Sequence, residues 1–194
     1  VEYTPMKVDF IRSYDPEPDV EPGKLEEAAK LINCAKKPLV LVGQGVELGS
    51  AQEELRAFLE KADIPCGCTM LGLSAIPTDH YLNKGMLGMH GNLAPNVKTN
   101  ECDVLIAVGM RFDDRVTGRL DTYAKQAKVI HLDIDPSEID KNVKVDIPVL
   151  GDCKQTLAQL TELIQEKKHT EWIDSFEEYT KKEYEQVIER EVYP

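Results

Sequence analysis

The sequence lacks the features that mark several classes of protein. It has no apolar run of roughly 18 residues, the length that a transmembrane helix needs. Its 23 Lys and Arg face 35 Asp and Glu, a net charge of −12, whereas a nucleic-acid partner requires a basic face. The G-x-S-x-G, H-E-x-x-H and Walker lysine motifs are missing. We therefore expect no membrane partner, no nucleic-acid partner and no nucleophile of its own.

Disulfides and metal sites are also disfavoured. The five cysteines are an odd number, and four of them lie in or beside apolar stretches: Cys34, Cys66, Cys68, Cys102 and Cys153. No second C-x-C pair or nearby His completes a zinc site. Reduced, buried thiols are typical of cytosolic proteins, so we expect a cytoplasmic protein that holds no metal. The chain begins at Val1 without a visible signal peptide, and we expect it to be part of a longer protein.

The apolar pattern predicts an α/β domain. Short apolar segments at 38–43, 64–68, 103–109, 128–134 and 147–150 alternate with stretches of helical periodicity such as 23–35. This alternation is typical of a parallel sheet covered on both faces. We expect a Rossmann-like, three-layer domain with about six strands over residues 23–168, preceded by a proline-rich extended arm at 1–22.

Residues 169–194 differ from the rest of the chain. They are strongly acidic, and Trp172, Phe176 and Tyr179 recur at helical spacing. Two interpretations fit this pattern: a surface helix that packs on its own domain, or a helical connector towards a missing C-terminal domain.

A glycine turn follows the first apolar strand. Gly43-Gln44-Gly45 belongs to a G-x-G-x-x-x-G spacing, which is not the dinucleotide fingerprint. About twenty residues on, where an NAD-binding fold needs an acid for the ribose, the chain has Pro65 and Cys66. Ordinary NAD binding is therefore disfavoured. The turn is either a ligand-free connection or an anion site made by its amides.

Several acids and hydroxyls are expected to cap helices. Ser50 with Glu53 matches a capping box, and Asp135 and Asp152 each precede a predicted helix. Asp133 ends the strand before Asp135 and has no capping role. A carboxylate at that position can accept hydrogen bonds from ribose or ring hydroxyls.

The most informative stretch runs from 85 to 118. A loop rich in Gly and Met leads to a short helix, then to a buried strand, then to a turn with Arg111 and Arg115 on either side of Asp113 and Asp114. Ligands of open α/β sheets bind beyond the carboxyl ends of strands, and Arg guanidinium groups suit phosphate oxygens. A solvated turn with internal ion pairs is the alternative. Adjacent carboxylates make a poor acid–base pair, so the residues predict a binding domain for a nucleotide-like ligand.

Three motifs resemble one enzyme family. G-M-L-G-M-H-G at 85–91, D-V-L-I-A-V-G-x-R-F-D-D-R-V-T-G at 103–118 and H-L-D-I-D-P-S-E-I at 131–139 look like acetolactate synthase. They resemble the central domain of its large, catalytic subunit, a thiamine-diphosphate enzyme. The similarity runs from about Pro38 to Leu157, and R-F-D-D-R-V-T-G is its most specific part.

The resemblance implies a six-stranded Rossmann-like domain that holds FAD, which has no net redox duty in the main reaction. The matching flavin positions are Gly43, Gln44, Gly45, Thr69, Met70, Leu71, Gly88, Met89, His90, Gly91, Arg111, Phe112, Asp113, Asp133, Ile134, Glu138, Gly151, Asp152 and Cys153. Met89 and Arg115 match positions that reach the substrate channel. One departure is Gln44, which interrupts a turn that is commonly three glycines and would be strained at a positive φ.

The resemblance also implies what the chain lacks. The family's catalytic glutamate lies in a preceding domain, and its motif for thiamine diphosphate and Mg²⁺ lies in a following one. We therefore expect the chain alone to be inactive. The whole enzyme, in the bacterial cytoplasm, joins decarboxylated pyruvate to a second 2-oxo acid in branched-chain amino acid biosynthesis. It is a homodimer or higher oligomer with a small regulatory subunit. The alternatives are a related central domain that binds another adenine nucleotide or none, an NAD oxidoreductase, and a structural scaffold between domains.

Overall fold

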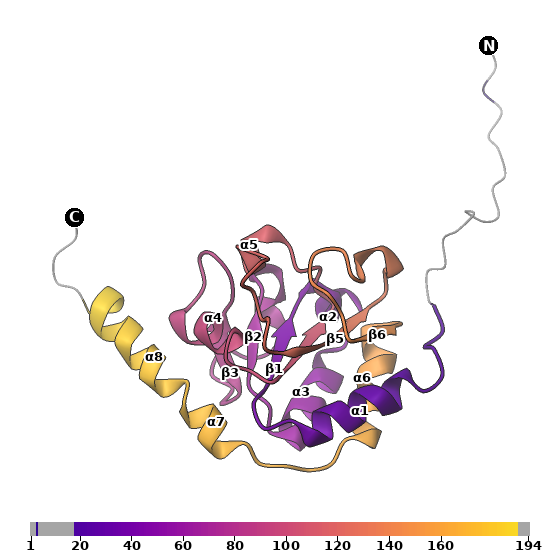
Figure 1. The fold of residues 1–194 in the computed structure, drawn as a ribbon, viewed down its shortest axis with the longest axis horizontal. Coiled ribbons are helices and arrows are strands. Elements are labelled where there is room, and N and C mark those ends of the chain that lie inside the picture. The colour runs from indigo at the N-terminus through magenta and orange to yellow at the C-terminus, as the bar shows by residue number, and fades with distance from the viewer. Residues whose placement is uncertain (1–2, 4–17, 190–194) are drawn as a thin grey trace.

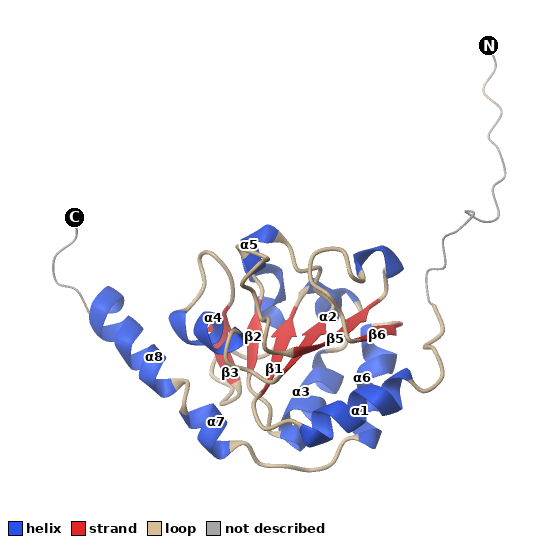
Figure 2. Ribbon diagram, in the orientation of Figure 1, coloured by secondary structure: helices blue, strands red, loops and turns tan. Residues whose placement is uncertain are grey.

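A computed structural model describes Tyr3 and residues 18–189 of the chain. It contains a single parallel sheet with helices on both faces (Figures 1 and 2). This arrangement confirms the predicted three-layer α/β fold. Most of the arm predicted at 1–22 lies outside the described residues.

The elements follow one another in a regular alternation. The strands are β1 (Pro38–Val42), β2 (Cys66–Cys68), β3 (Asn83–Met86), β4 (Val104–Val108), β5 (Lys128–Asp133) and β6 (Ile147–Leu150). The α-helices are α1 (Lys24–Cys34), α2 (Gln44–Leu48), α3 (Gln52–Ala62), α4 (Leu93–Thr99), α5 (Asp114–Thr117), α6 (Cys153–Leu163), α7 (Thr170–Asp174) and α8 (Glu177–Glu183). Shorter helical turns are η1 (Met70–Ala75), η2 (Pro136–Glu138) and the π-type η3 (Tyr184–Ile188).

The sheet has the strand order β3-β2-β1-β4-β5-β6, and every pair is parallel. The chain moves outward from β1 to β3 and then crosses back to β4 on the other side of β1. The strand order therefore reverses between β1 and β4. In doubly wound sheets this switch point opens a crevice beyond the carboxyl ends of the strands.

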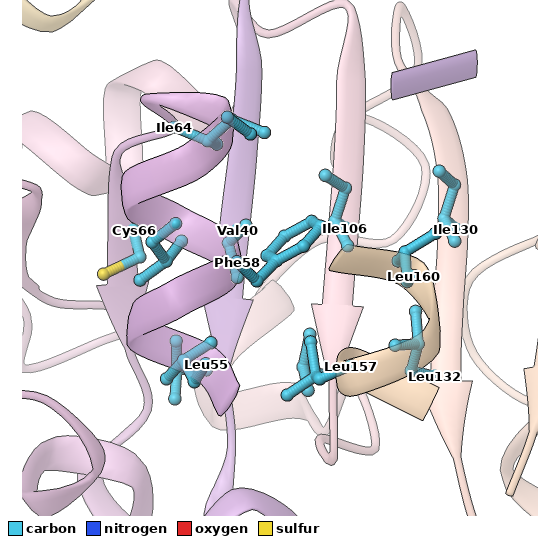
Figure 3. Close-up of a cluster of buried hydrophobic side chains, with 14 of the residues drawn as sticks. Val40, Leu55, Phe58, Ile64, Cys66, Ile106, Ile130, Leu132, Leu157 and Leu160 are labelled. Carbon is cyan, nitrogen blue, oxygen red and sulfur yellow. The ribbon is translucent and has the colours of Figure 1, made fainter. Parts of the chain in front are cut away.

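Alternating residues of the central strands face two separate cores. In β1, Val40 and Val42 face the core that α1, α3 and α6 cover, whereas Leu39 and Leu41 face the opposite core. Every residue of β1 is buried, which explains why the strand is continuously apolar. Figure 3 labels side chains of the first core: Val40, Leu55, Phe58, Ile64, Cys66, Ile106, Ile130, Leu132, Leu157 and Leu160.

The second core is covered by α4 and by the C-terminal helices. Trp172 and Phe176 are buried there, and the Trp172 Nε1–H donates to the Pro38 carbonyl oxygen at 2.7 Å. Residues 170–183 thus pack on their own domain (Figure 1), which is the first of the two interpretations of this segment. Its role as a connector and the domain limits at 22 and 168 stay predictions.

Two local predictions are wrong. Residues 83–86 form β3 rather than a loop. Ser50 does not cap a helix, because it adopts a left-handed conformation with φ of 50°, and α3 begins later, with Ala51 as its N-cap. The S-x-x-E pattern is overridden here because the chain must turn between α2 and α3, and a left-handed residue makes that turn.

All five cysteines are free; Cys34 is exposed and the other four are buried. Within the described part of the chain, no helix combines the length and the apolar character that crossing a membrane would need.

Candidate functional site

A cleft of about 820 Å³ lies at the carboxyl ends of the central strands. Its walls come from the segments that follow β1, β2, β3, β4 and β5, together with the start of α6. Sites for small molecules and cofactors typically enclose about 300–1,000 Å³. The cleft therefore has the size and the position expected of a cofactor site in this type of sheet.

The floor of the cleft is a contact between two glycine turns. The Gly43 and Gly45 amides donate to the carbonyl oxygens of Val108 and Gly109, both at 2.9 Å. A Cβ atom at Gly43 would lie 2.1 Å from the Gly109 oxygen, and one at Gly45 would lie 2.6 Å from the Gly109 Cα atom. No side chain fits there, so glycine is required on both sides of the switch point.

The first turn is less available to an anion than its sequence suggests. Gln44 begins α2 and is not among the residues with positive φ, so the strain that a positive φ would cause at this position is absent. Two amides of the turn, those of Gly43 and Gly45, already donate to β4 and its turn. Positive charge for a phosphate must therefore come mainly from side chains.

The turn after β4 supplies that charge. Phe112 adopts a left-handed φ of 50°, and its side chain is buried edge-on against Tyr123 and His131. Backbone strain of this kind persists only where surrounding packing enforces it. With Phe112 anchored in the core, the neighbouring Arg111 side chain is 68% exposed at the cleft.

The carboxylates of this turn do little to neutralise the arginines. Asp113 caps α5 by accepting a hydrogen bond from the Arg115 amide at 3.0 Å, and it meets Arg111 Nη2 only at 3.4 Å. The closest polar contact of the Arg115 guanidinium is the Met89 sulfur at 3.8 Å. An exposed ion pair is weak. Of the internal ion pairs that the alternative interpretation requires, the described turn contains one long contact, between Arg111 and Asp113. Both arginines therefore remain able to bind an anion.

Exposed apolar side chains form another part of the cleft wall. Leu48, Met70, Leu71 and Met89 are 77%, 64%, 63% and 65% exposed, and all four line the cleft. Large apolar side chains gathered at one exposed place mark a binding surface. Their position beside two arginines suits a ligand that carries both a flat ring and phosphate.

The Gly- and Met-rich loop lies directly against the arginine turn. The Met89 amide donates to the Arg115 carbonyl oxygen at 2.8 Å. Gly88 has a φ of 97°, and a Cβ atom there would lie 2.4 Å from the same oxygen. The structure thus brings together two segments that both carry predicted site residues, through contacts such as that of Met89 with Arg115, 26 positions apart in the sequence.

Acidic side chains lie at the β5 end of the cleft. Asp133 is buried; its Oδ1 accepts from the Asp135 amide at 3.0 Å, and its Oδ2 lies 3.4 Å from His131 Nε2. Glu138 pairs through Oε1 with Lys141 at 2.7 Å, while its buried Oε2 has no hydrogen-bond partner within the described protein. A buried acceptor without a partner is costly, and here it lines the cleft.

The start of α6 closes this end. Asp152 caps the helix by accepting from the Lys154 and Gln155 amides, as predicted. Asp135 likewise caps η2 through the Ser137 amide. Cys153 is buried beside the cleft, and burial, followed by the charges of Asp133 and Asp152, raises the pKa of its thiol to about 12. The thiol is therefore neutral at physiological pH and is not a nucleophile.

Most of the predicted positions meet in this cleft. Those that line it are Gly43, Gln44, Gly45, Thr69, Met70, Leu71, Met89, His90, Arg111, Phe112, Asp113, Arg115, Asp133, Ile134, Glu138, Asp152 and Cys153. Gly88, Gly91 and Gly151 do not line it. The lining residues that were not predicted are Leu48, Gly49, Met86, Leu87, Gly109, Met110 and Val116. Gly109 and Met110 were detectable, because they directly follow the most apolar strand.

The described residues form no metal centre, because no group of three His, Cys, Asp or Glu side chains among them could hold an ion.

The doubly wound sheet and the cleft at its switch point define an α/β domain with a candidate cofactor site. The chain belongs to the family "Thiamine pyrophosphate enzyme, central domain", whose sequence profile matches residues 25–160.

The chain is also similar to named acetolactate synthase subunits. It is 48% identical over 156 residues to the "Probable acetolactate synthase large subunit" of Methanocaldococcus jannaschii, covering 80% of this chain and 26% of that protein. The "Acetolactate synthase large subunit" of Corynebacterium glutamicum is 45% identical over 175 residues, covering 88% and 28%. The "Acetolactate synthase isozyme 3 large subunit" of Escherichia coli is 38% identical over 169 residues, covering 87% and 29%. The chain thus spans little more than a quarter of the length of these relatives.

Proposed function

We propose that this domain binds FAD in the cleft at the β1–β4 switch point. The observation that carries the proposal is the combination, within one cleft, of two weakly paired arginines, an exposed apolar wall and a buried carboxylate oxygen without a partner. A flavin dinucleotide contains the matching groups: a diphosphate, a flat ring system and ribose hydroxyls.

The residues of the cleft suit these groups. Arg111 would bind the diphosphate, where a charge-assisted hydrogen bond is stronger than a neutral one. Met70 and Leu71 would pack against the flat ring. Met89 and Arg115 would lie towards the substrate, and the charge of Arg115 would also attract the diphosphate. Asp133 and Glu138 would accept hydrogen bonds from hydroxyls of the adenosine half. When bound, FAD would supply a rigid wall for the active site rather than a net oxidation or reduction.

The whole protein is proposed to be the large subunit of an acetolactate synthase. It would condense pyruvate with a second 2-oxo acid, using thiamine diphosphate and Mg²⁺ bound outside this chain. The names of the relatives and the family assignment support this activity. We also propose that the whole protein forms a homo-oligomer with a small subunit and is located in the cytoplasm. The free buried thiols support a location in a reducing compartment.

FAD titration of the 194-residue chain tests the flavin site directly. We expect a saturable change in flavin fluorescence and a higher midpoint of thermal unfolding. A ligand at about 100 times its Kd stabilises the folded state by roughly 2.7 kcal/mol. AMP and riboflavin serve as controls, because each carries only one part of the ligand and should bind far more weakly.

Two results would contradict the proposal. An unchanged midpoint and fluorescence at millimolar FAD would show that this domain holds no complete flavin site. Equal binding of AMP and FAD would instead favour a related central domain that recognises another adenine nucleotide.

A further inference from the structure

The C-terminal helices cross the edge of the domain beside α4 (Figure 1). We call residues 170–183, which comprise α7 and α8, the strap. Its first anchor is Trp172, which is buried and bonded to the Pro38 carbonyl oxygen. The second anchor is Phe176, which is fully buried in the second core. The centroid of its ring lies 5.8 Å from Lys84 Nζ.

A buried lysine holds the strap against α4. Lys98 of α4 is 5% exposed, and its Nζ lies 5.1 Å from the ring centroids of both Trp172 and Tyr179. The same Nζ pairs with Glu101 at 2.7 Å, and the Tyr179 hydroxyl donates to Glu101 at 3.2 Å. Cation–π contacts are strongest when the cation is desolvated, as it is here.

The end of the strap then caps α4. The Glu183 carboxylate accepts a hydrogen bond from the Leu93 amide at 3.1 Å, although the two residues are 90 positions apart. It also accepts from Asn92 Nδ2 at 3.4 Å. The first amides of a helix lack partners within the helix, and a negative charge there is favourable. The N-cap residue Asn92 makes no side-chain cap of its own, so Glu183 replaces it.

Asn92 is thereby free to hold the loop of the cleft. The Asn92 Oδ1 accepts a hydrogen bond from the Met86 backbone amide, and the Asn92 backbone amide donates to the Met86 carbonyl oxygen, both at 2.8 Å. One turn later, Asn96 accepts from the Gly88 amide and donates to the Gly88 oxygen, both at 2.9 Å. The first turn of α4 therefore holds both Met86 and Gly88, the residues on which the position of Met89 depends.

We propose that Glu183 is a positioning residue for the cofactor loop at 86–91. Its charge fixes the first turn of α4, which frees Asn92 and Asn96 to clamp the loop, and the loop sets Met89 against Arg115. This inference deepens the proposed function, because it assigns control of the flavin site to a side chain that does not line the cleft. A change in the strap would thus alter the loop without touching the ligand.

Amide hydrogen exchange of the chain without flavin tests the inference independently of FAD binding. In Glu183→Ala we expect the Met86 and Gly88 amides to exchange roughly tenfold faster, the effect of losing one charge-assisted hydrogen bond. Glu183→Gln keeps one acceptor oxygen and should restore part of the protection. Glu185→Ala is the matched control, since Glu185 is exposed and meets only Lys181, at 3.7 Å.

Fluorescence of the single tryptophan separates positioning from detachment. Trp172 reports whether the strap is docked, and its emission should be unchanged in Glu183→Ala. Unaltered exchange at Met86 and Gly88 would overturn the inference. So would a red-shifted emission, because the whole strap would then have come loose. The affinity for FAD should fall in Glu183→Ala. If the unmodified chain does not bind FAD, the proposed function fails, but the amide exchange rates of Met86 and Gly88 still decide the role of Glu183.

Discussion

The amide of Gly45 donates to the carbonyl oxygen of Gly109 at 2.9 Å, which joins the turn after β1 to the turn after β4. These turns belong to the two strands between which the sheet reverses its order. The contact fixes the spacing of the cleft walls, because Gly45 lies in the first turn of α2 and the arginines follow Gly109. The shape of the cleft thus depends on a contact between two backbone turns at which no side chain fits.

Replacing Gly45 by Ala should destabilise the protein. Gly45 lies in α2 without a positive φ, so alanine would be neutral or favourable by helix propensity. Its Cβ atom, however, would lie 2.6 Å from the Gly109 Cα atom. We expect the free energy of unfolding, measured in urea, to fall by at least about 2 kcal/mol because of overpacking.

Gly23→Ala is the matched control for this substitution. Gly23 has a φ of 85°, but a Cβ atom there would have no other atom within 4 Å, so alanine should cost only about 1 kcal/mol of backbone strain. If Gly45→Ala were as stable as Gly23→Ala, the turns would not be in the tight contact described.

Removing the charge of either arginine should weaken FAD binding. In Arg111→Gln and in Arg115→Gln we expect Kd to rise roughly 10- to 100-fold, as for the loss of a charge-assisted hydrogen bond. The difference from the unmodified chain should shrink as salt is added, because salt screens exposed charges. Arg119→Gln is the control, since Arg119 pairs with Asp121 outside the cleft. Equal affinities in all four proteins would exclude a phosphate role for the two arginines.

Much of the architecture was predictable because local pattern and fold agree. The continuously apolar strands β1 and β4 and the charged turn at 111–115 indicate the place of the cleft from the sequence alone. The strand β3 was missed because Asn83-Lys84-Gly85-Met86 has no apolar alternation. It forms at the edge of the sheet and pairs with β2 alone.

Other features depend on tertiary contacts that no local pattern contains. Leu48 lines the cleft because the Gly45–Gly109 contact positions α2, and the spacing of Gly45 does not reveal its partner. The apolar spacing of Trp172 and Phe176 predicted a helix face but not the surface that it covers. The Glu183–Leu93 bond joins residues 90 positions apart, so only the fold discloses it.

Two buried thiols should make the protein less stable in alkali. Burial, the largest cause, raises the pKa of Cys102 and of Cys153 to about 12 from an unfolded value of 9.0. Below pH 9 both states keep the protons, so stability is unaffected. Above it the unfolded thiols ionise while the folded ones do not, and the free energy of unfolding falls until about pH 12.

The double variant Cys102→Ala, Cys153→Ala should lose less stability between pH 7.5 and 10.5 than the unmodified chain. The expected difference is roughly 1–2 kcal/mol per thiol, because each pH unit contributes up to about 1.4 kcal/mol. Urea unfolding at the two pH values measures it. Cys34→Ala, which removes an exposed thiol, should follow the unmodified chain. An identical alkaline loss in all three proteins would contradict raised pKa values for the buried thiols.

Lys98 should be the main anchor of the strap on α4. Lys98→Ala removes a desolvated cation from the faces of Trp172 and Tyr179 and leaves Glu101 without its ion-pair partner. We expect about 2–3 kcal/mol of lost stability and a red shift in Trp172 emission. Lys98→Met, which keeps the aliphatic volume, should recover part of the loss, because apolar replacements of buried charges are often tolerated. Lys182→Ala, an exposed lysine of the same strap, should change neither signal. If Lys98→Ala kept its stability and emission, the strap would be held by Trp172 and Phe176 alone, and the buried cation would have no anchoring role.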